Sequence, residues 1–164
     1  MKGGQKVIVI NSEDSYKTVV EEFSDMIFRI AYQNLFHIAD AEDVVQEVFI
    51  KLLRQKNCEF ADKEHLKAWL IRVTLNQCTD FRRMFRKVRE EPLENYNFGF
   101  TAQDNSMLDL IAELPKEERT LIYLYYYEGY KIREISDILG KRQNTVNSKL
   151  VRARKKLKHM LEDM

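Results

Sequence analysis

Four carboxylates stand close together early in the chain and could hold a divalent metal ion for phosphodiester chemistry. Asp40, Asp43 and Glu47 are about one helical turn apart, and Glu42 lies between them. An oxygen-ligand site needs more groups, and no second carboxylate or His cluster completes this one. The sequence also offers no Gly-rich phosphate loop and no nucleophile with a plausible base. We therefore expect no metal, no cofactor and no enzymatic activity.

A second group of candidate residues is basic. The stretch NTVNSKLVRARKKL, residues 144–157, contains no Asp or Glu, although the formal net charge of the chain is only +1. Such a run is often the solvated face of a helix, and it also has the composition of a surface that meets phosphate. Charge alone leaves both interpretations open. The basic residues are Lys149, Arg152, Arg154, Lys155 and Lys156.

The spacing of apolar residues predicts that the basic stretch is a helix with two different sides. A shorter apolar helix from Ile132 to Leu139 precedes it and ends at Gly140, and Asn144 or Thr145 is suited to cap the second helix. This order is typical of a helix-turn-helix, whose second helix enters the major groove of DNA. The apolar side is Val146, Leu150, Ala153 and Leu157. The opposite side is Ser148, Val151, Arg152 and Lys155, with Asn147 at its edge.

Residues 66–87 combine an apolar seam with cations. Aromatic rings beside positive charges suit single-stranded nucleic acid, because bases stack on the rings and phosphates pair with the cations. Trp69 could instead belong to the core, since large aromatic side chains usually serve packing. The seam is Leu66, Trp69, Leu70, Val73 and Phe81, and the cations are Arg72, Arg82, Arg83, Arg86 and Lys87.

The segment DAEDVVQEVFIKLLR, residues 40–54, predicts a helix with one buried and one polar side. The polar side holds Asp43, Gln46 and Glu47, and Ile50 falls among them. A single exposed apolar residue is common on protein surfaces, but this one would also suit a face that docks a basic partner helix. The buried side is Ala41, Val44, Val45, Val48, Phe49 and Leu52.

These groups need helices to position them, and the composition predicts an all-α protein. The 164 residues contain five Gly and two Pro, and long stretches follow a period near 3.6. A strand has support only at residues 7–10. Helical periodicity covers about 16–34, 41–54 and 65–88, resumes near Met107, and restarts at Pro115 in the favoured first-turn position before stopping at Gly129.

A change of composition divides the chain. Residues 89–106 mix Pro, Gly, Asn and Asp without an apolar period, which predicts a flexible linker. We expect two small helical domains, at 15–88 and 107–164, with the helix-turn-helix in the second. No apolar run approaches the roughly 20 residues that span a bilayer, so we expect a cytoplasmic protein without membrane insertion. Cys58 and Cys78 lack zinc-ligand spacing and are expected to be reduced thiols.

Three segments together resemble bacterial RNA polymerase sigma factors of the extracytoplasmic-function class. They are DAEDVVQEVFIKL, LKAWLIRVTLNQCTDFRR and LPKEERTLIYLYYYEGYKIREISDILGKRQNTVNSKLVRARKKL, in this order. The resemblance covers nearly everything from Ser15 to Leu161. It implies two helical domains on a flexible linker and a protein that directs core RNA polymerase to promoter DNA. It also implies an anti-sigma factor that masks the docking and DNA-binding surfaces.

The resemblance further implies roles for single residues. The helix from Asp40 to Leu52 would face the clamp helices of the largest polymerase subunit through Asp43, Gln46, Glu47 and Ile50. The loop from Asn57 to His65 would capture an unstacked base of the minus-ten element. Residues expected at that strand are Phe60 and Asn76, together with Arg72, Arg82 and Arg83. Residues expected at the minus-thirty-five element are Asn144, Thr145, Asn147, Ser148, Lys149, Val151, Arg152 and Lys155.

Two positions depart from the family pattern. Asn144 stands where relatives usually have Gly, and Asn147 stands where they often have a basic residue. Because an Asn amide pairs bidentately with adenine, Asn147 hints at an A in the target. The alternative is an operator-binding regulator with a sensor domain, which would be a stable dimer. That alternative leaves the acidic helix and the aromatic-basic helix unexplained, whereas a sigma factor is expected to be a monomer when free.

Overall fold

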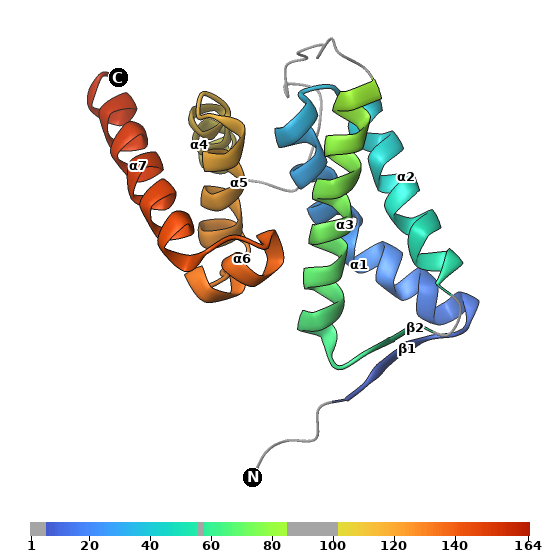
Figure 1. Cartoon of the computed structure of the whole chain (residues 1–164). Helices are drawn as coiled ribbons and strands as arrows, with labels where there is room; N and C mark the ends of the chain where they lie inside the picture. The colour runs from blue at the N-terminus through green and yellow to red at the C-terminus, as the bar shows by residue number, and fades with distance from the viewer. Residues whose placement is uncertain (1–5, 56–57, 85–101) are drawn as a thin grey trace. The chain divides into compact units, whose positions relative to one another are not determined.

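The computed structural model describes residues 6–55, 58–84 and 102–164, with side chains from residue 107 onward in the last range. The chain divides into two compact units, residues 1–91 and 92–164 (Figure 1). Most of the expected linker, 89–101, lies outside the described residues. Each unit is built mainly of helices, so the prediction of an all-α protein with two helical domains is confirmed as a fold class.

The first unit is a bundle of three helices in which each helix contacts the other two. These are α1 (Glu13–Leu35), α2 (Ile38–Arg54) and α3 (Lys63–Met84). Their apolar sides meet in a core that excludes water almost completely, and this burial is the main stabilising contribution. The core includes Ile27, Ala31, Ala41, Val44, Leu66 and Leu70.

Local signals fix the ends of α1 and the start of α2. Ser12 Oγ accepts a hydrogen bond from the Ser15 amide at 3.2 Å, and Ser15 Oγ accepts one from the Ser12 amide at 3.1 Å. This reciprocal capping satisfies two amides at the helix start. Phe36 takes a left-handed conformation with φ 53° and ends α1. His37 then caps α2 by accepting from the Asp40 amide at 3.3 Å, so the two helices form a tight hairpin.

A short antiparallel ladder joins two segments that are distant in the sequence. Strand β1 (Ile8–Ile10) pairs with β2 (Cys58–Phe60), with Ile8 opposite Phe60 and Ile10 opposite Cys58. The strand signal at residues 7–10 predicted β1. The second strand was missed, because three residues are too few to show an alternating pattern.

The second unit contains α4 (Ala102–Ala112), α5 (Lys116–Ile122), α6 (Ile132–Leu139) and α7 (Gln143–Glu162). A π-helical turn, Tyr123–Tyr127, continues α5. Gly129 and Gly140 have φ of 71° and 61°, values that glycine adopts at little cost. Gly140 ends α6, as predicted. The core of this unit includes Leu114, Leu121, Leu124, Ile135, Val146 and Leu150.

Three helix starts differ from the expectation. The helix α4 begins at Ala102, inside the predicted linker, because the Asp, Asn and Ser that suggested a loop are also common in first turns. Pro115 is the N-cap of α5 rather than its first residue. Arg142 is the N-cap of α7, so Asn144 and Thr145 lie in the first turn, since the turn after Gly140 is shorter than the capping signal indicated. Among the described residues, no helix is long and apolar enough to cross a membrane.

Candidate functional site

The helix α7 presents a polar outer face above a buried stripe. Val146, Leu150 and Ala153 are fully buried against the rest of the unit, as the spacing predicted, and Leu157 is half-buried. Val151, three residues after Ser148, keeps 40% of its surface exposed. Ser148 Oγ donates to the Thr145 carbonyl at 3.1 Å, which leaves its oxygen able to accept from a ligand. The exposed residues of this outer face are Asn147, Ser148, Val151, Arg152 and Lys155.

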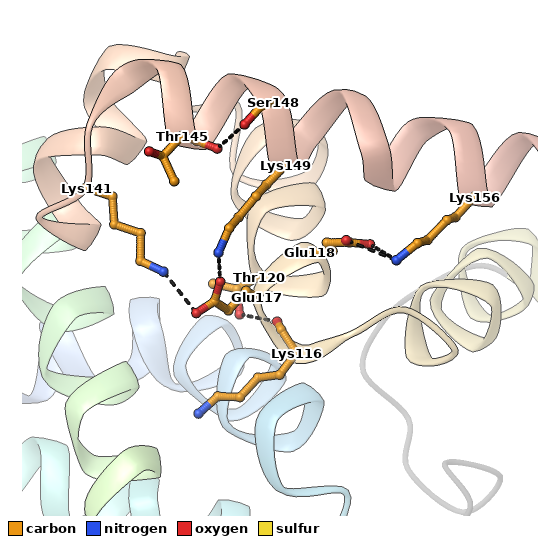
Figure 2. A network of polar contacts seen from close by, with 9 residues as sticks. All are labelled: Lys116, Glu117, Glu118, Thr120, Lys141, Thr145, Ser148, Lys149 and Lys156. Atoms are coloured by element: carbon orange, nitrogen blue, oxygen red, sulfur yellow. Dashed lines mark hydrogen bonds and ion pairs between the residues drawn. The ribbon is translucent and has the colours of Figure 1, made fainter.

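Two of the lysines in the basic run point elsewhere, toward α5 (Figure 2). Lys149 Nζ pairs with Glu117, which also receives Lys141 from the turn before α7 at 3.1 Å. Lys156 Nζ contacts Glu118 at 2.8 Å. Lys149 was expected at the minus-thirty-five element. In this structure its ammonium group already has a carboxylate partner. Sequence reasoning missed this, since Glu117 and Lys149 are brought together only by the packing of α5 on α7.

Arg154 is also turned away from the outer face. Its guanidinium lies over the rings of Tyr125 and Tyr126, at 4.9 Å and 5.5 Å from their centroids. Stacking of this kind is favourable for a planar cation. Of the five basic residues between 144 and 157, Arg152 and Lys155 are exposed, whereas Lys149, Arg154 and Lys156 are half-buried. The net positive charge offered outward is smaller than the sequence suggests, and it is concentrated on one side of the helix.

The helix α3 has a row of polar residues on one side. Arg72, Asn76 and Arg83 are exposed and follow helical spacing, so they lie along one face. Trp69 continues this row toward the start of α3 and is half-buried, neither a core residue nor a free ring. This arrangement places the Trp69 ring one turn from Arg72, with Asn76 and Arg83 further along the same face. An aromatic ring close to a guanidinium group suits single-stranded nucleic acid.

Two residues expected in this group lie elsewhere. Phe60, at the end of β2, is 3% exposed and packs edge-on against His65 and Trp69, so its ring is not presented to a ligand. Arg82 is half-buried and donates to the Asn34 carbonyl at the end of α1. The Arg82 contact joins α3 to the end of α1, and the Phe60 contacts join β2 to the start of α3, so periodicity along α3 alone could not reveal either. The group that remains on the surface is Trp69, Arg72, Asn76 and Arg83.

The outer face of α2 agrees with its sequence pattern. Asp43, Gln46 and Glu47 are exposed, and Ile50 is half-buried among them. The helix also exposes 56% of Leu53, three residues after Ile50, which sequence reasoning overlooked. The spacing of 50 and 53 on the polar side was the signal that could have found it.

A hollow of about 630 Å³ lies beside Leu53, between the start of α1 and the end of α2. Tyr16 lines it and donates its hydroxyl to the Phe49 carbonyl at 3.2 Å. Burial raises the pKa of the Tyr16 hydroxyl, so it stays a donor. Burial likewise raises the pKa of the Cys58 thiol, whose Sγ contacts Gln55 Oε1 at 2.9 Å.

The early carboxylates do not converge on a common point. Asp40 Oδ1 lies 3.1 Å from His37 Nδ1, whereas Asp43 and Glu47 face solvent. Within the described ranges, no group of three His, Cys, Asp or Glu side chains is arranged to bind a metal ion.

Comparisons with known proteins match both units to one family. The model of sigma-70 region 2 matches residues 19–88, and that of sigma-70 region 4 matches residues 104–157. RNA polymerase sigma factor SigV of Bacillus subtilis is 29% identical over 149 residues, covering 88% of this chain and 89% of the relative. ECF RNA polymerase sigma factor SigE of Mycolicibacterium smegmatis is 31% identical over 160 residues, covering 90% and 62%.

A solved structure has the same fold. It is the sigma factor RpoE in complex with the anti-sigma factor NepR from Bartonella quintana. The TM-score is 0.66 at 21% identity, and the match covers 91% of this chain and 98% of the other.

Proposed function

The chain belongs to the extracytoplasmic-function class of the sigma-70 family, and from this premise we propose which of its surfaces perform each part of transcription initiation. Members direct core RNA polymerase to promoters, and this is the function of the chain. We assign it no catalytic step of its own and place it in the cytoplasm, where it would meet polymerase and the chromosome. Its two domains would correspond to residues 15–88 and to the unit that begins with α4.

The outer face of α7 is the proposed reader of the minus-thirty-five element. Side chains at Asn147, Ser148, Val151 and Arg152 would approach base edges in the major groove, because they stand opposite the buried stripe. Arg152 could donate two hydrogen bonds to guanine O6 and N7, whereas the Asn147 amide could donate to adenine N7 and accept from adenine N6. Lys155 would contact phosphate. Lys149 is left out, since its ammonium group is paired with Glu117.

The row on α3 is the proposed contact for the melted minus-ten strand. Asn76 would bond to a base edge, while Arg72 and Arg83 would hold the backbone phosphates. A base that leaves the duplex needs an enclosing surface, and the loop 58–65 together with Trp69 would provide one wall. Phe60 would support this wall from beneath, since it packs against Trp69.

The outer face of α2 is the proposed docking surface for core polymerase. Asp43 and Glu47 supply negative charge, and Ile50 and Leu53 supply apolar area in the same row. Interfaces commonly combine an apolar centre with a charged rim. Charges of this kind would steer a basic partner helix into register.

An anti-sigma factor is a further proposed partner. The structure of RpoE with NepR is a complex of this type. Here, such a protein would cover the α2 face and the α7 face.

The observation that carries the functional assignment most directly is the α7 helix, whose exposed polar face stands over a fully buried apolar stripe directly after a glycine turn. The decisive experiment is transcription by purified core polymerase with and without the chain, followed by mapping of start sites. Start sites that appear only with the chain support the assignment. Equal transcription in both reactions would contradict it.

A further inference from the structure

The loop proposed to receive the minus-ten base, residues 58–65, begins with a strand that pairs with a segment preceding α1 in the sequence. The strand β2, which lies between α2 and α3 in the sequence, forms an antiparallel ladder with β1 (Figure 1). In this ladder Val9 stands directly opposite Glu59. The two strands are separated in the sequence by α1 and α2. The segment before α1 therefore touches the same loop that the proposed function assigns to the minus-ten base.

One face of the two-stranded ladder is buried, and the other face is exposed. Ile10 and Phe60 are buried, while Val9 and Glu59 are exposed. Ile8 stands opposite Phe60, so an apolar cross-strand pair backs the ring that contacts Trp69. The chain of contacts thus runs from Ile8 through Phe60 to the aromatic surface on α3.

Each end of the loop has its own anchor. At the α3 end, the Ala61 amide donates to His65 Nδ1 at 3.1 Å, and the His65 amide donates to Asp62 Oδ1 at 2.8 Å. At the β2 end, the ladder with β1 is the anchor. The strand β1 is in turn held close to α1, because the Asn11 amide donates to Ser15 Oγ at 3.3 Å and Ser12 caps the helix.

The contribution of β1 is separable from the folding of the bundle. A pair of three-residue strands is marginal on its own. The three helices pack through Val44, Leu66, Leu70 and other residues that β1 does not supply. Loss of the ladder should therefore release the loop while the helices stay packed.

We propose that β1 is a positioning element for promoter opening: it fixes β2, and through Phe60 it holds the loop and Trp69 in the conformation that receives the unstacked base. The inference rests on the proposed role of the α3 row in minus-ten recognition. It assigns a role in that reaction to the segment before α1, and it makes residues 8–10 determinants of opening rather than of polymerase binding.

A charge-matched pair of variants tests it. Val9→Glu places like charges directly opposite each other across the ladder, and Val9→Lys places Lys opposite Glu59. Both change an exposed position, so the core is left alone. With holoenzyme on a duplex promoter, V9E should open the minus-ten region about two- to fivefold more slowly than V9K, measured as permanganate reactivity of promoter thymines. Affinity for core polymerase and the unfolding temperature should be the same in both.

A second substitution, at Glu59, should restore promoter opening in the V9E variant. Adding Glu59→Lys to V9E restores opposite charges across the ladder and should recover the opening rate relative to E59K alone. A pre-melted promoter should reduce the difference between V9E and V9K. Recovery and reduction together support positioning, because a general loss of structure would not respond to the sign of one surface pair.

The results that would contradict the role of β1 differ from those that would contradict the proposed minus-ten surface. Equal opening rates in V9E and V9K, while Asn76→Ala still impairs opening, would overturn the role of β1 and leave the proposed function standing. Unchanged opening in N76A and Trp69→Ala would overturn the proposed minus-ten surface and the role of β1 with it. A lower unfolding temperature and weaker polymerase binding in V9E would also overturn the inference, since β1 would then serve the fold.

Discussion

Lys156 donates to both carboxylate oxygens of Glu118, at 3.0 Å and 2.8 Å, and so ties the middle of α7 to the start of α5. Glu118 is only 5% exposed, whereas the lysine side chain keeps 39% of its surface in contact with solvent. Two turns before it, Lys149 makes the equivalent contact with Glu117. These pairs fix the rotation of α7, because they hold one edge of the helix against α5 while the outer face stays free.

Breaking the Lys156 pair should destabilise the second domain. In Lys156→Ala, the nearly buried carboxylate of Glu118 loses its charged partner, and we expect a loss of about 1–2 kcal/mol in the free energy of unfolding, discounted because the lysine is partly solvated. Thermal or denaturant unfolding of the full chain measures this. Lys158→Ala is the matched control, since Lys158 pairs with Glu162 on the surface. Equal losses in both variants would contradict the role given to Glu118.

Substitution of two neighbouring arginines on α3 should affect different properties, namely stability for one and DNA binding for the other. Arg82 donates to the Asn34 carbonyl, so Arg82→Ala should cost about 1–2 kcal/mol of stability. Arg83 is exposed, so Arg83→Ala should leave stability within about 0.5 kcal/mol and weaken binding to a melted minus-ten strand. Unfolding curves and binding to a pre-melted promoter separate the two effects. If Arg83→Ala were the more destabilising change, the assignment of the two side chains would be reversed.

Charge reversal on α2 should weaken assembly with core polymerase. Asp43→Lys combined with Glu47→Lys removes the negative charge beside Ile50 and Leu53 and repels a basic partner helix, and we expect at least about tenfold weaker binding. Glu21→Lys on α1 is the control, because Glu21 is exposed and pairs only loosely with Lys17, at 3.8 Å. Binding of labelled core enzyme measures both. Wild-type affinity in the folded double variant would remove the α2 face from the docking surface.

Features that are determined by residues within one helix could be predicted from the sequence. The outer faces of α2 and α7 follow from a period of 3.6, so the exposure of Asp43, Glu47 and Arg152 could be predicted without a structure. The end of α6 at Gly140 is equally local. The direction of a long flexible side chain is different, because it depends on what packs nearby. The pairing of Lys149 with Glu117 could not be predicted, since Glu117 comes from another helix.

Contacts between segments that are distant in the sequence could not be predicted, because they too depend on tertiary packing. Phe60 was expected to meet DNA, yet it is buried by Trp69 and by a strand that precedes the first helix. Its cross-strand partner Ile8 is separated from it by the whole of α1 and α2, and no period along a single segment encodes that pairing. The departure changes the proposed mechanism, because Phe60 becomes a support for the base-binding surface rather than a part of it.

Three residues of α7 provide the sharpest test of how that helix meets DNA. Arg152 is exposed opposite the buried stripe, Lys155 is exposed one turn later, and Lys149 is paired with Glu117. With polymerase holoenzyme, Arg152→Ala should cost about 1–3 kcal/mol at the cognate minus-thirty-five element and relax the preference at one position. Lys155→Ala should weaken binding to all sequences alike and lower the salt slope by about one, because it removes a single phosphate contact.

Lys149→Ala should behave unlike either of them. It removes a partner of Glu117 rather than a DNA contact, so the salt slope should stay unchanged while the free energy of unfolding falls by about 0.5–1 kcal/mol. Titrations at several salt concentrations, on cognate and scrambled elements, distinguish the three variants. If Lys149→Ala lowered the salt slope as Lys155→Ala does, Lys149 would leave Glu117 for phosphate in the complex. If Arg152→Ala lost affinity equally on both elements, Arg152 would be a phosphate contact, and the orientation proposed for α7 in the groove would be wrong.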